Sequence, residues 1–122
     1  MQNPQIGLQD LRVLCYTIGM KYAMILTTCP NRENAVQIAN LLLKQKLAAC
    51  VQLQEVESFY TWEGEPQNGI EILLSVKTRA DKFQEVEKTI CAAHPYTCPQ
   101  IIQLPIENGF QSYLAWIDEN VV

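Results

Sequence analysis

The sequence predicts an α+β domain of the ferredoxin-like, split-βαβ type: an antiparallel sheet with two helices on one face, followed by a C-terminal helix. Three observations lead to this fold class. Strand-like and helix-like patterns follow one another in the order strand, helix, strand, strand, helix, strand. These segments form two βαβ halves, residues 22–62 and 70–104. The chain has 122 residues, which suits one domain with its own core.

The first half begins with a short apolar strand, Tyr22–Thr28, which Cys29 and Pro30 end. Asn31 then suits a helix N-cap, because its side chain accepts hydrogen bonds from the free backbone N–H groups of a first turn. A helix is predicted from about Arg32 to Lys46. Its apolar residues recur at the spacing of one helical face: Ala35, Ile38, Ala39 and Leu42.

The segment 48–62 is predicted to be an unusually long strand. Its apolar residues are odd-numbered at Val51 and Leu53 and even-numbered from Val56 onward. Because neighbouring residues of a strand point to opposite faces, this change of phase predicts a β-bulge or bend near Gln54-Glu55.

The second half follows a turn that is marked by Gly64, Pro66 and Gly69. A strand over 70–77 comes next, because its apolar residues alternate. They are Ile70, Ile72, Leu74 and Val76. The run 78–81, Thr-Arg-Ala-Asp, matches a helix capping box, and Pro95 ends the helix that it opens.

A short strand, Gln100–Leu104, completes the second half, and a last helix opens at Asn108 or Gly109. The apolar stripe of this helix is Phe110, Tyr113, Leu114 and Ile117.

The long strand predicts an oligomer. A globule of this size is about 35 Å across, whereas fifteen extended residues reach about 50 Å. A strand that projects exposes unpaired backbone groups, which a second chain can pair. Phe59, Tyr60 and Trp62 at its outer end are of the residue types that are enriched in interface cores. The alternative is a monomer whose bulge folds the strand back over its own helices.

The net charge and the cysteine count indicate which classes of partner and which cellular compartment suit the protein. Thirteen acidic and nine basic residues give a net charge of −4, which disfavours binding to nucleic acid or to an anionic membrane. No apolar run reaches the roughly 20 residues that span a bilayer. Five cysteines, an odd number without a CxxC pair, favour a reducing compartment, and we expect a cytoplasmic protein.

Residues 1–19 have weak periodicity, and Met20 directly precedes the segment that begins with Lys21 and contains the first strand. We therefore expect a domain over 20–122, with residues 1–19 as an extension that lies upstream of a true start at Met20. The alternative is an N-terminal arm that packs loosely on the domain.

Several runs of residues match one known family in order and spacing between about 22 and 120. They are KLAACV at 46–51, SFYTWEG at 58–64, Glu71 with VKT at 76–78, HPYTCP at 94–99 and YLAWI at 113–117. On these runs the chain resembles the CutA family of divalent-cation tolerance proteins. Residues 1–19 lie outside the resemblance, which supports Met20 as the start.

The resemblance implies a ferredoxin-like subunit in a tight homotrimer, with strands that pair across subunits and an architecture like that of PII signalling proteins. It also implies a part in tolerance of copper and other divalent metals, with no established reaction. Enzyme motifs such as a Gly-rich phosphate loop, GxSxG or HExxH are absent from the sequence, and we expect no enzyme. No cofactor is expected to be obligatory, and a copper ion is the possible ligand.

His94, the only histidine, stands where the family has a metal ligand, and imidazole is a common ligand at neutral pH. Ala93 replaces a second histidine of some members, which lowers the expected affinity. The alternative role for His94 is a cap at a helix C-terminus. Cys50 is a second candidate, because thiolates suit copper; the alternative is a small buried apolar residue.

Other candidates carry weaker signals. A family metal cysteine in the first strand corresponds to Thr27, so Cys29 could replace it only if the turn presents Cys29 inward. Cys91, His94 and Cys98 form a C-x2-H-x3-C run without a strong zinc precedent. Glu71 and Lys77 flank an apolar strand, where they form an ion pair, line a polar subunit cleft or face solvent.

The function expected from these residues is tolerance or homeostasis of divalent metals by a cytoplasmic trimer with a weak copper site. Three alternatives stay open: a PII-like module that binds a small effector at its subunit clefts, a structural trimer that anchors a partner, and an enzyme. No motif in the sequence identifies the physiological metal, the effector or a protein partner.

Overall fold

A computed structural model describes residues 20–122, so the predictions for residues 1–19 lie outside the described part. The elements in chain order are β1 (Tyr22–Cys29), α2 (Arg32–Lys44), β2 (Cys50–Trp62), β3 (Glu65–Arg79), the 3₁₀ turn η2 (Ala80–Lys82), α3 (Phe83–Ala93), β4 (Ile101–Ile106) and α4 (Gln111–Asn120).

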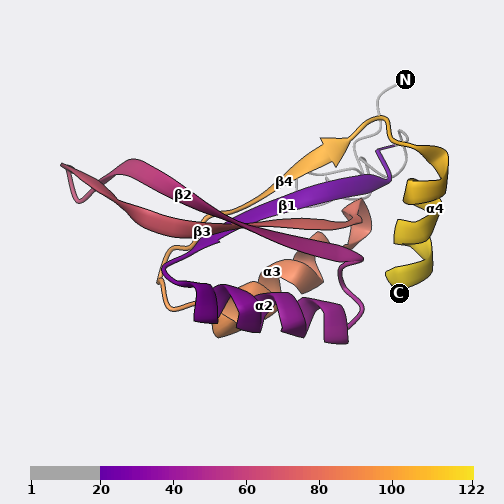
Figure 1. Ribbon diagram of the computed structural model, residues 1–122, viewed down its shortest axis with the longest axis horizontal. Coiled ribbons are helices and arrows are strands. Elements are labelled where there is room, and N and C mark those ends of the chain that lie inside the picture. The colour runs from indigo at the N-terminus through magenta and orange to yellow at the C-terminus, as the bar shows by residue number, and fades with distance from the viewer. Residues whose placement is uncertain (1–19) are drawn as a thin grey trace, which may run out of the picture.

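The four strands form one antiparallel sheet in the order β2-β3-β1-β4. Helices α2 and α3 cover one face of this sheet, and α4 lies at one end of it (Figure 1). The β2–β3 hairpin projects past the opposite end (Figure 1). This arrangement confirms the predicted ferredoxin-like fold with its additional C-terminal helix.

The core lies between the sheet and the helices α2 and α3. Odd-numbered residues of β1 and even-numbered residues of β3 point toward the helices, as strand alternation requires. The fully buried residues of this core include Ile25, Ala35, Ile38, Leu42, Leu74, Val76, Val86 and Ile90.

Helix α2 begins as predicted, since Asn31 Oδ1 accepts a hydrogen bond of 2.8 Å from the Asn34 backbone N–H. The helix ends at Lys44 and not at Lys46. Lys46 adopts a positive φ of 58°, a left-handed conformation that stops helical hydrogen bonding.

The β2–β3 hairpin contains no bulge, so the predicted break near Gln54-Glu55 is wrong. Pairing runs without interruption from Cys50 opposite Lys77 to Trp62 opposite Glu65. The apolar residues change faces because the hairpin leaves the region that the helices cover. Val51 and Leu53 point toward the helices, whereas Tyr60 points to the opposite face of the same regular strand.

The hairpin turn is shorter than predicted. Glu63 and Gly64 both have positive φ, at 51° and 80°, as the two central residues of a tight hairpin turn require. Pro66 and Gly69 therefore belong to β3, which begins at Glu65 and not at residue 70. The expected inward position of Ile70 is also wrong in the single chain, because its side chain is 55% exposed on the projecting hairpin.

The capping box predicted over 78–81 does not form. Thr78 lies in β3 and its hydroxyl donates a hydrogen bond of 2.7 Å to the Leu47 carbonyl. Asp81 instead pairs with Arg79 at 2.9 Å. Strand β4 extends through Pro105, which is tolerated because β4 is an edge strand.

Helix α4 begins at Gln111 and buries less of its predicted stripe than expected. Ile117 is fully buried, but Phe110, at the N-cap, is 77% exposed. Asp118 ties the helix to the start of β1, because it accepts hydrogen bonds from the Tyr22 hydroxyl at 2.5 Å and from Lys21 Nζ at 3.1 Å.

Candidate functional site

His94 follows the last residue of α3 and is buried between that helix and the end of β1. Its Nδ1 accepts a hydrogen bond of 3.1 Å from the Tyr96 backbone N–H. Nε2 must then carry the ring proton, which it donates to the Thr28 carbonyl at 2.7 Å. The ring joins the loop after α3 to β1, which is a structural role like that of the capping histidine considered above.

Cys29 is the thiol that faces this histidine. Its side chain is fully buried, and Sγ lies 3.9 Å from His94 Nε2. The chain thus presents Cys29 inward, as the sequence required of a replacement for Thr27. Burial, with Glu71 nearby, raises the pKa of the Cys29 thiol to about 11, so the thiol is protonated at neutral pH.

Cys50 does not share a site with His94 within one chain. Cys50 pairs with Lys77, which in turn lies opposite Met24, whereas His94 contacts the far end of β1 at Thr28. Four residues of strand, about 13 Å, separate these two places. The predicted ligands therefore lie well apart on the sheet.

A metal ion does not fit the described residues as they are arranged. Both nitrogens of His94 are engaged, and the neighbouring Cys29 thiol holds its proton. Between residues 20 and 122, no three side chains of the His, Cys, Asp and Glu types come together as a ligand set. Cys91 and Cys98 are exposed whereas His94 is buried, so their sequence run does not form the three-ligand site considered above.

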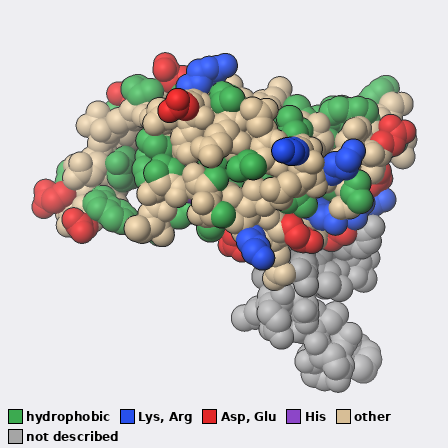
Figure 2. Space-filling model, turned by 90° about the horizontal axis from the view of Figure 1, so that it is seen from below, with side chains coloured by type: hydrophobic (Ala, Val, Ile, Leu, Met, Phe, Trp, Pro, Cys, Tyr) green, Lys and Arg blue, Asp and Glu red, His purple; other side chains and the backbone are tan. Residues whose placement is uncertain are grey.

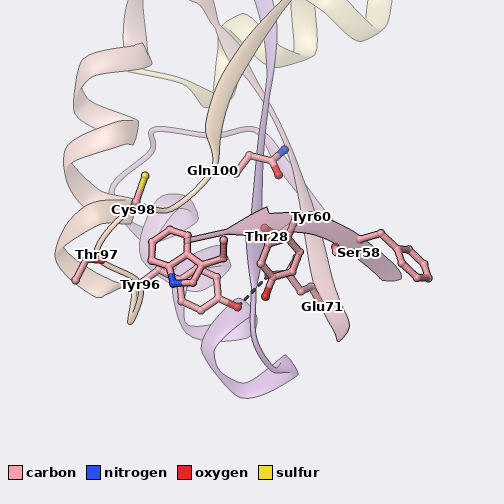
Figure 3. Close-up of a pocket in the computed structure, with 10 residues that line it drawn as sticks. Thr28, Ser58, Tyr60, Glu71, Tyr96, Thr97, Cys98 and Gln100 are labelled. Carbon is pink, nitrogen blue, oxygen red and sulfur yellow. Dashed lines mark hydrogen bonds between the residues drawn. The ribbon is translucent and has the colours of Figure 1, made fainter. Parts of the chain in front are cut away.

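A pocket of about 630 Å³ opens at the base of the projecting hairpin. The hairpin, the end of β1 and the loop between α3 and β4 contribute to it (Figure 3). Its lining residues are Thr28, Ser58, Phe59, Tyr60, Trp62, Glu71, Tyr96, Thr97, Cys98 and Gln100. A space of this size accommodates a small organic molecule.

Tyr96 and Glu71 form the polar centre of this pocket. The Tyr96 hydroxyl donates a hydrogen bond of 2.9 Å to Glu71 Oε2, with the Tyr60 ring beside the pair (Figure 3). Burial and the bond to the Glu71 carboxylate raise the pKa of Tyr96 to about 12. The phenol is therefore a donor to Glu71 throughout the physiological pH range.

The three aromatic residues predicted for the trimer interface gather on the hairpin, where they also line the pocket. In the single chain Phe59 is 73% exposed, Trp62 50% and Tyr60 49%. Large exposed apolar groups that lie together mark a surface that contacts a ligand or a partner. Whether these residues form a subunit interface stays a prediction.

Glu71 and Lys77 have separate roles, so the ion pair considered for them does not form. They lie six residues apart on β3, about 20 Å, which is beyond the reach of an ion pair. Glu71 lines the pocket, whereas Lys77 Nζ donates a hydrogen bond of 2.7 Å to Gln52 Oε1.

Tyr96 is the functional candidate that sequence reasoning missed. It follows the helix-ending Pro95 in the loop that places it opposite the hairpin. An aromatic residue in a short loop between a helix and a strand was the available signal, because scaffold loops often carry binding residues. Thr28 and Gln100, which also line the pocket, had no such signal.

The described part of the chain contains no helix of the length and apolarity that crossing a membrane would need.

Three comparisons relate this chain to known proteins. The family model for the "CutA1 divalent ion tolerance protein" matches residues 23–120. A protein from Archaeoglobus fulgidus named "Divalent-cation tolerance protein CutA" is 46% identical over 97 residues, which cover 80% of this chain and 95% of that protein. A protein of the same name from Thermus thermophilus is 42% identical over 98 residues, again 80% and 95% of the two chains.

The solved structure of the A. fulgidus protein, described as periplasmic, superposes with a TM-score of 0.81 at 44% identity. The superposition covers 83% of this chain and 99% of that one.

Proposed function

The chain belongs to the family of CutA1 divalent ion tolerance proteins, and from this membership we propose that it supports tolerance of divalent metal ions as a non-catalytic homotrimer. The family match over residues 23–120, almost the whole described domain, is the observation that carries the proposal. Deletion of the gene is expected to lower the copper concentration that arrests growth of its cell, and re-expression of the chain to restore it. Unchanged sensitivity to copper, zinc and cobalt in the deletion strain would refute the role in tolerance.

The trimer is supported by the shape of the subunit. The hairpin projects from the sheet, β2 is an edge strand, and large aromatic residues are exposed along it. Light scattering is expected to give three times the chain mass of 13.9 kDa at micromolar protein. A mass of one chain under these conditions would overturn the assembly.

We propose that copper, where the chain binds it, is held weakly by His94 and the Cys29 thiol of the same chain, and that Cys50 joins His94 only if the two come from different subunits. Cys29 supports this because its sulfur already lies near the ring. Binding must displace hydrogen bonds of His94 and the proton of the thiol, which keeps the affinity low. Titration of Cu(I), Cu(II) and Zn(II) into wild type, His94→Ala, Cys29→Ser and Cys50→Ser tests this, and equal binding by His94→Ala would exclude the histidine.

A second function, binding of a small effector, is favoured by the pocket itself. The pocket combines aromatic surface with one carboxylate and one phenol, the mixture typical of small-molecule sites. A thermal-shift screen of metabolites tests it, because a ligand that binds only the folded state raises the melting temperature.

We propose a reducing compartment, the cytoplasm, as the place of action. The support is that the four cysteines in the described domain, Cys29, Cys50, Cys91 and Cys98, are all free thiols. Fractionation of the native cell, followed by detection of the chain in each fraction, tests this localisation.

A further inference from the structure

The chemistry of the pocket at the base of the hairpin restricts its ligand. Four of its lining residues are aromatic: Phe59, Tyr60, Trp62 and Tyr96. Glu71 is the single charged side chain among the described residues that line it. Neither lysine nor arginine from residues 20–122 contributes to this lining.

One oxygen of the Glu71 carboxylate is available to contact a ligand. Oε2 accepts the bond from the Tyr96 hydroxyl, but Oε1 has no hydrogen-bond partner within the described domain. The side chain is half-buried at the base of the hairpin, where aromatic surface reduces its hydration. A cation at this place would gain both the carboxylate and the faces of aromatic rings.

The charges on the hairpin around the pocket also favour a positively charged ligand. From Val51 to Val76 the hairpin carries no lysine or arginine but five glutamates: Glu55, Glu57, Glu63, Glu65 and Glu71. In Figure 2 the end of the molecule that carries the hairpin, at the left, shows acidic and hydrophobic side chains. This field attracts cations and repels phosphates and carboxylates. An anionic effector such as a nucleotide therefore does not suit the pocket.

We propose that this pocket binds an organic ammonium ion, with Glu71 as the counter-charge and the aromatic rings of Tyr60, Trp62 and Tyr96 as its walls. The proposal rests on the second proposed function, the binding of a small effector, and it names the class of that effector. A quaternary or primary ammonium group with an apolar body matches the lining, because aromatic rings attract the charge and also contact the alkyl groups. Bare divalent ions do not match, since a lone carboxylate offers too few ligands.

The test compares two probes of one shape and different charge in calorimetric titrations of the full chain. Choline carries a quaternary nitrogen, and 3,3-dimethylbutan-1-ol has a carbon in its place and is neutral. Choline is expected to bind at least about tenfold more tightly than the neutral probe. Equal affinity of the two probes would show that charge is not recognised and would overturn the proposal.

Two glutamate variants separate a specific contact from the general field. Glu71→Gln is expected to weaken choline binding about tenfold, because it removes the counter-charge. Glu57→Gln changes the net charge equally but lies on the other face of the hairpin, outside the pocket lining, and is expected to leave binding unchanged. A similar loss in both variants would contradict a site at Glu71. The subunit mass and circular dichroism of both variants verify that the assembly is intact.

A third probe distinguishes failure of the ligand class from failure of the pocket. ATP binding that Tyr96→Ala abolishes, in the absence of choline binding, would overturn the ammonium proposal and leave the effector function standing. If choline, the neutral alcohol and ATP all fail to bind at millimolar concentration, the ammonium proposal is refuted, and the thermal-shift screen of metabolites decides the effector function separately. Neither result bears on metal tolerance, which the growth assay measures separately.

Discussion

His94, which was expected to be a metal ligand, has a structural role in the described chain. Its two ring nitrogens bond to the Thr28 carbonyl and to the Tyr96 N–H, and its ring centroid lies 4.9 Å from that of Tyr96. The imidazole therefore positions the residue that reaches Glu71 across the pocket. Loss of the ring would affect both the core and the pocket wall.

His94→Ala is expected to lower the free energy of unfolding by about 1–3 kcal/mol, because it leaves a buried carbonyl without its donor. Urea unfolding followed by circular dichroism measures this change. Thr97→Ala, in the same exposed loop, is the control and should stay within about 0.5 kcal/mol of wild type. Equal stability of wild type and His94→Ala would contradict the structural role of the ring.

The cysteines are expected to differ in reactivity. Cys29 is fully buried, and a rise in its pKa from 9.0 to about 11 lowers its thiolate fraction about a hundredfold at neutral pH. Cys91 and Cys98 are exposed. Iodoacetamide at pH 8, with peptide mass spectrometry, should label Cys91 and Cys98 quickly and Cys29 only after unfolding. Labelling of Cys29 in the native protein at the rate of Cys98 would contradict the described burial.

At the scale of elements, α4 depends on a small number of anchors. Ile117 is fully buried, and Asp118 bonds to Tyr22 and Lys21 at the start of β1. Burial acts to raise the pKa of Asp118, but the hydrogen bonds from Tyr22 and Lys21 outweigh it and lower the pKa below its usual range. The ionised form is thus the one that fastens α4.

The stability that Asp118 contributes should depend on pH. Because its folded-state pKa is depressed, the contribution is complete above the unfolded value near 3.8 and is lost as the pH falls through the folded value. Asp118→Asn is expected to lower the melting temperature at pH 7 and to flatten its fall between pH 5 and 2. Glu119→Gln, the adjacent carboxylate, is the charge-matched control. Parallel acid profiles for wild type and Asp118→Asn would refute this role.

The tight turn of the hairpin permits a second matched pair of variants. Neither Gly64 nor Gly69 has an atom within 4 Å of the place that a Cβ would occupy, but only Gly64 has a positive φ. Gly64→Ala should therefore cost about 1 kcal/mol of unfolding free energy through backbone strain. Gly69→Ala should be neutral or stabilising. A similar effect of both changes would show that the left-handed conformation of Gly64 does not matter.

Sequence patterns predicted most of these elements because local rules govern them. The cap at Asn31, the apolar face of α2 and the alternation in β3 all report contacts with one buried core. These local rules failed in the part of β2 that projects beyond the helices, where the core no longer determines which face is apolar. The phase change in β2 was interpreted as a bulge, since a pattern records which residues are apolar but not what covers each face.

On the scale of the whole molecule, the site was less predictable than the fold. Glu71 was considered for an ion pair, for a subunit cleft and for a solvated face, and the structure pairs it with Tyr96 from a loop 25 residues away in sequence. The placement of Cys29 beside His94 spans 65 residues. Such contacts depend on how β1 and the loop after α3 meet, which no local spacing encodes. The metal-binding role of His94 and Cys50 stays a prediction.

The stability of the proposed trimer should depend on the aromatic residues of the hairpin and not on exposed aromatic residues in other parts of the chain. Trp62→Ser is expected to raise, by at least about tenfold, the protein concentration at which the proposed trimer dissociates. A tryptophan that becomes buried when subunits associate contributes strongly to an interface. Phe110→Ser removes an even more exposed aromatic from the start of α4 and should leave the mass unchanged. Sedimentation across a dilution series measures both. Equal dissociation of the two variants would contradict an interface at the hairpin.

The uninterrupted pairing of β2 with β3 limits how the hairpin can change in length during evolution. Thirteen pairs run in register from Cys50 to Trp62 with no irregular residue to absorb a shift. Loss of one residue from either strand would invert every side chain between that point and the turn, so that Tyr60 and Trp62 would move to the other face. Insertions and deletions that preserve the pocket are therefore those that add or remove two residues from each strand together. Relatives with longer or shorter hairpins should differ in steps of four.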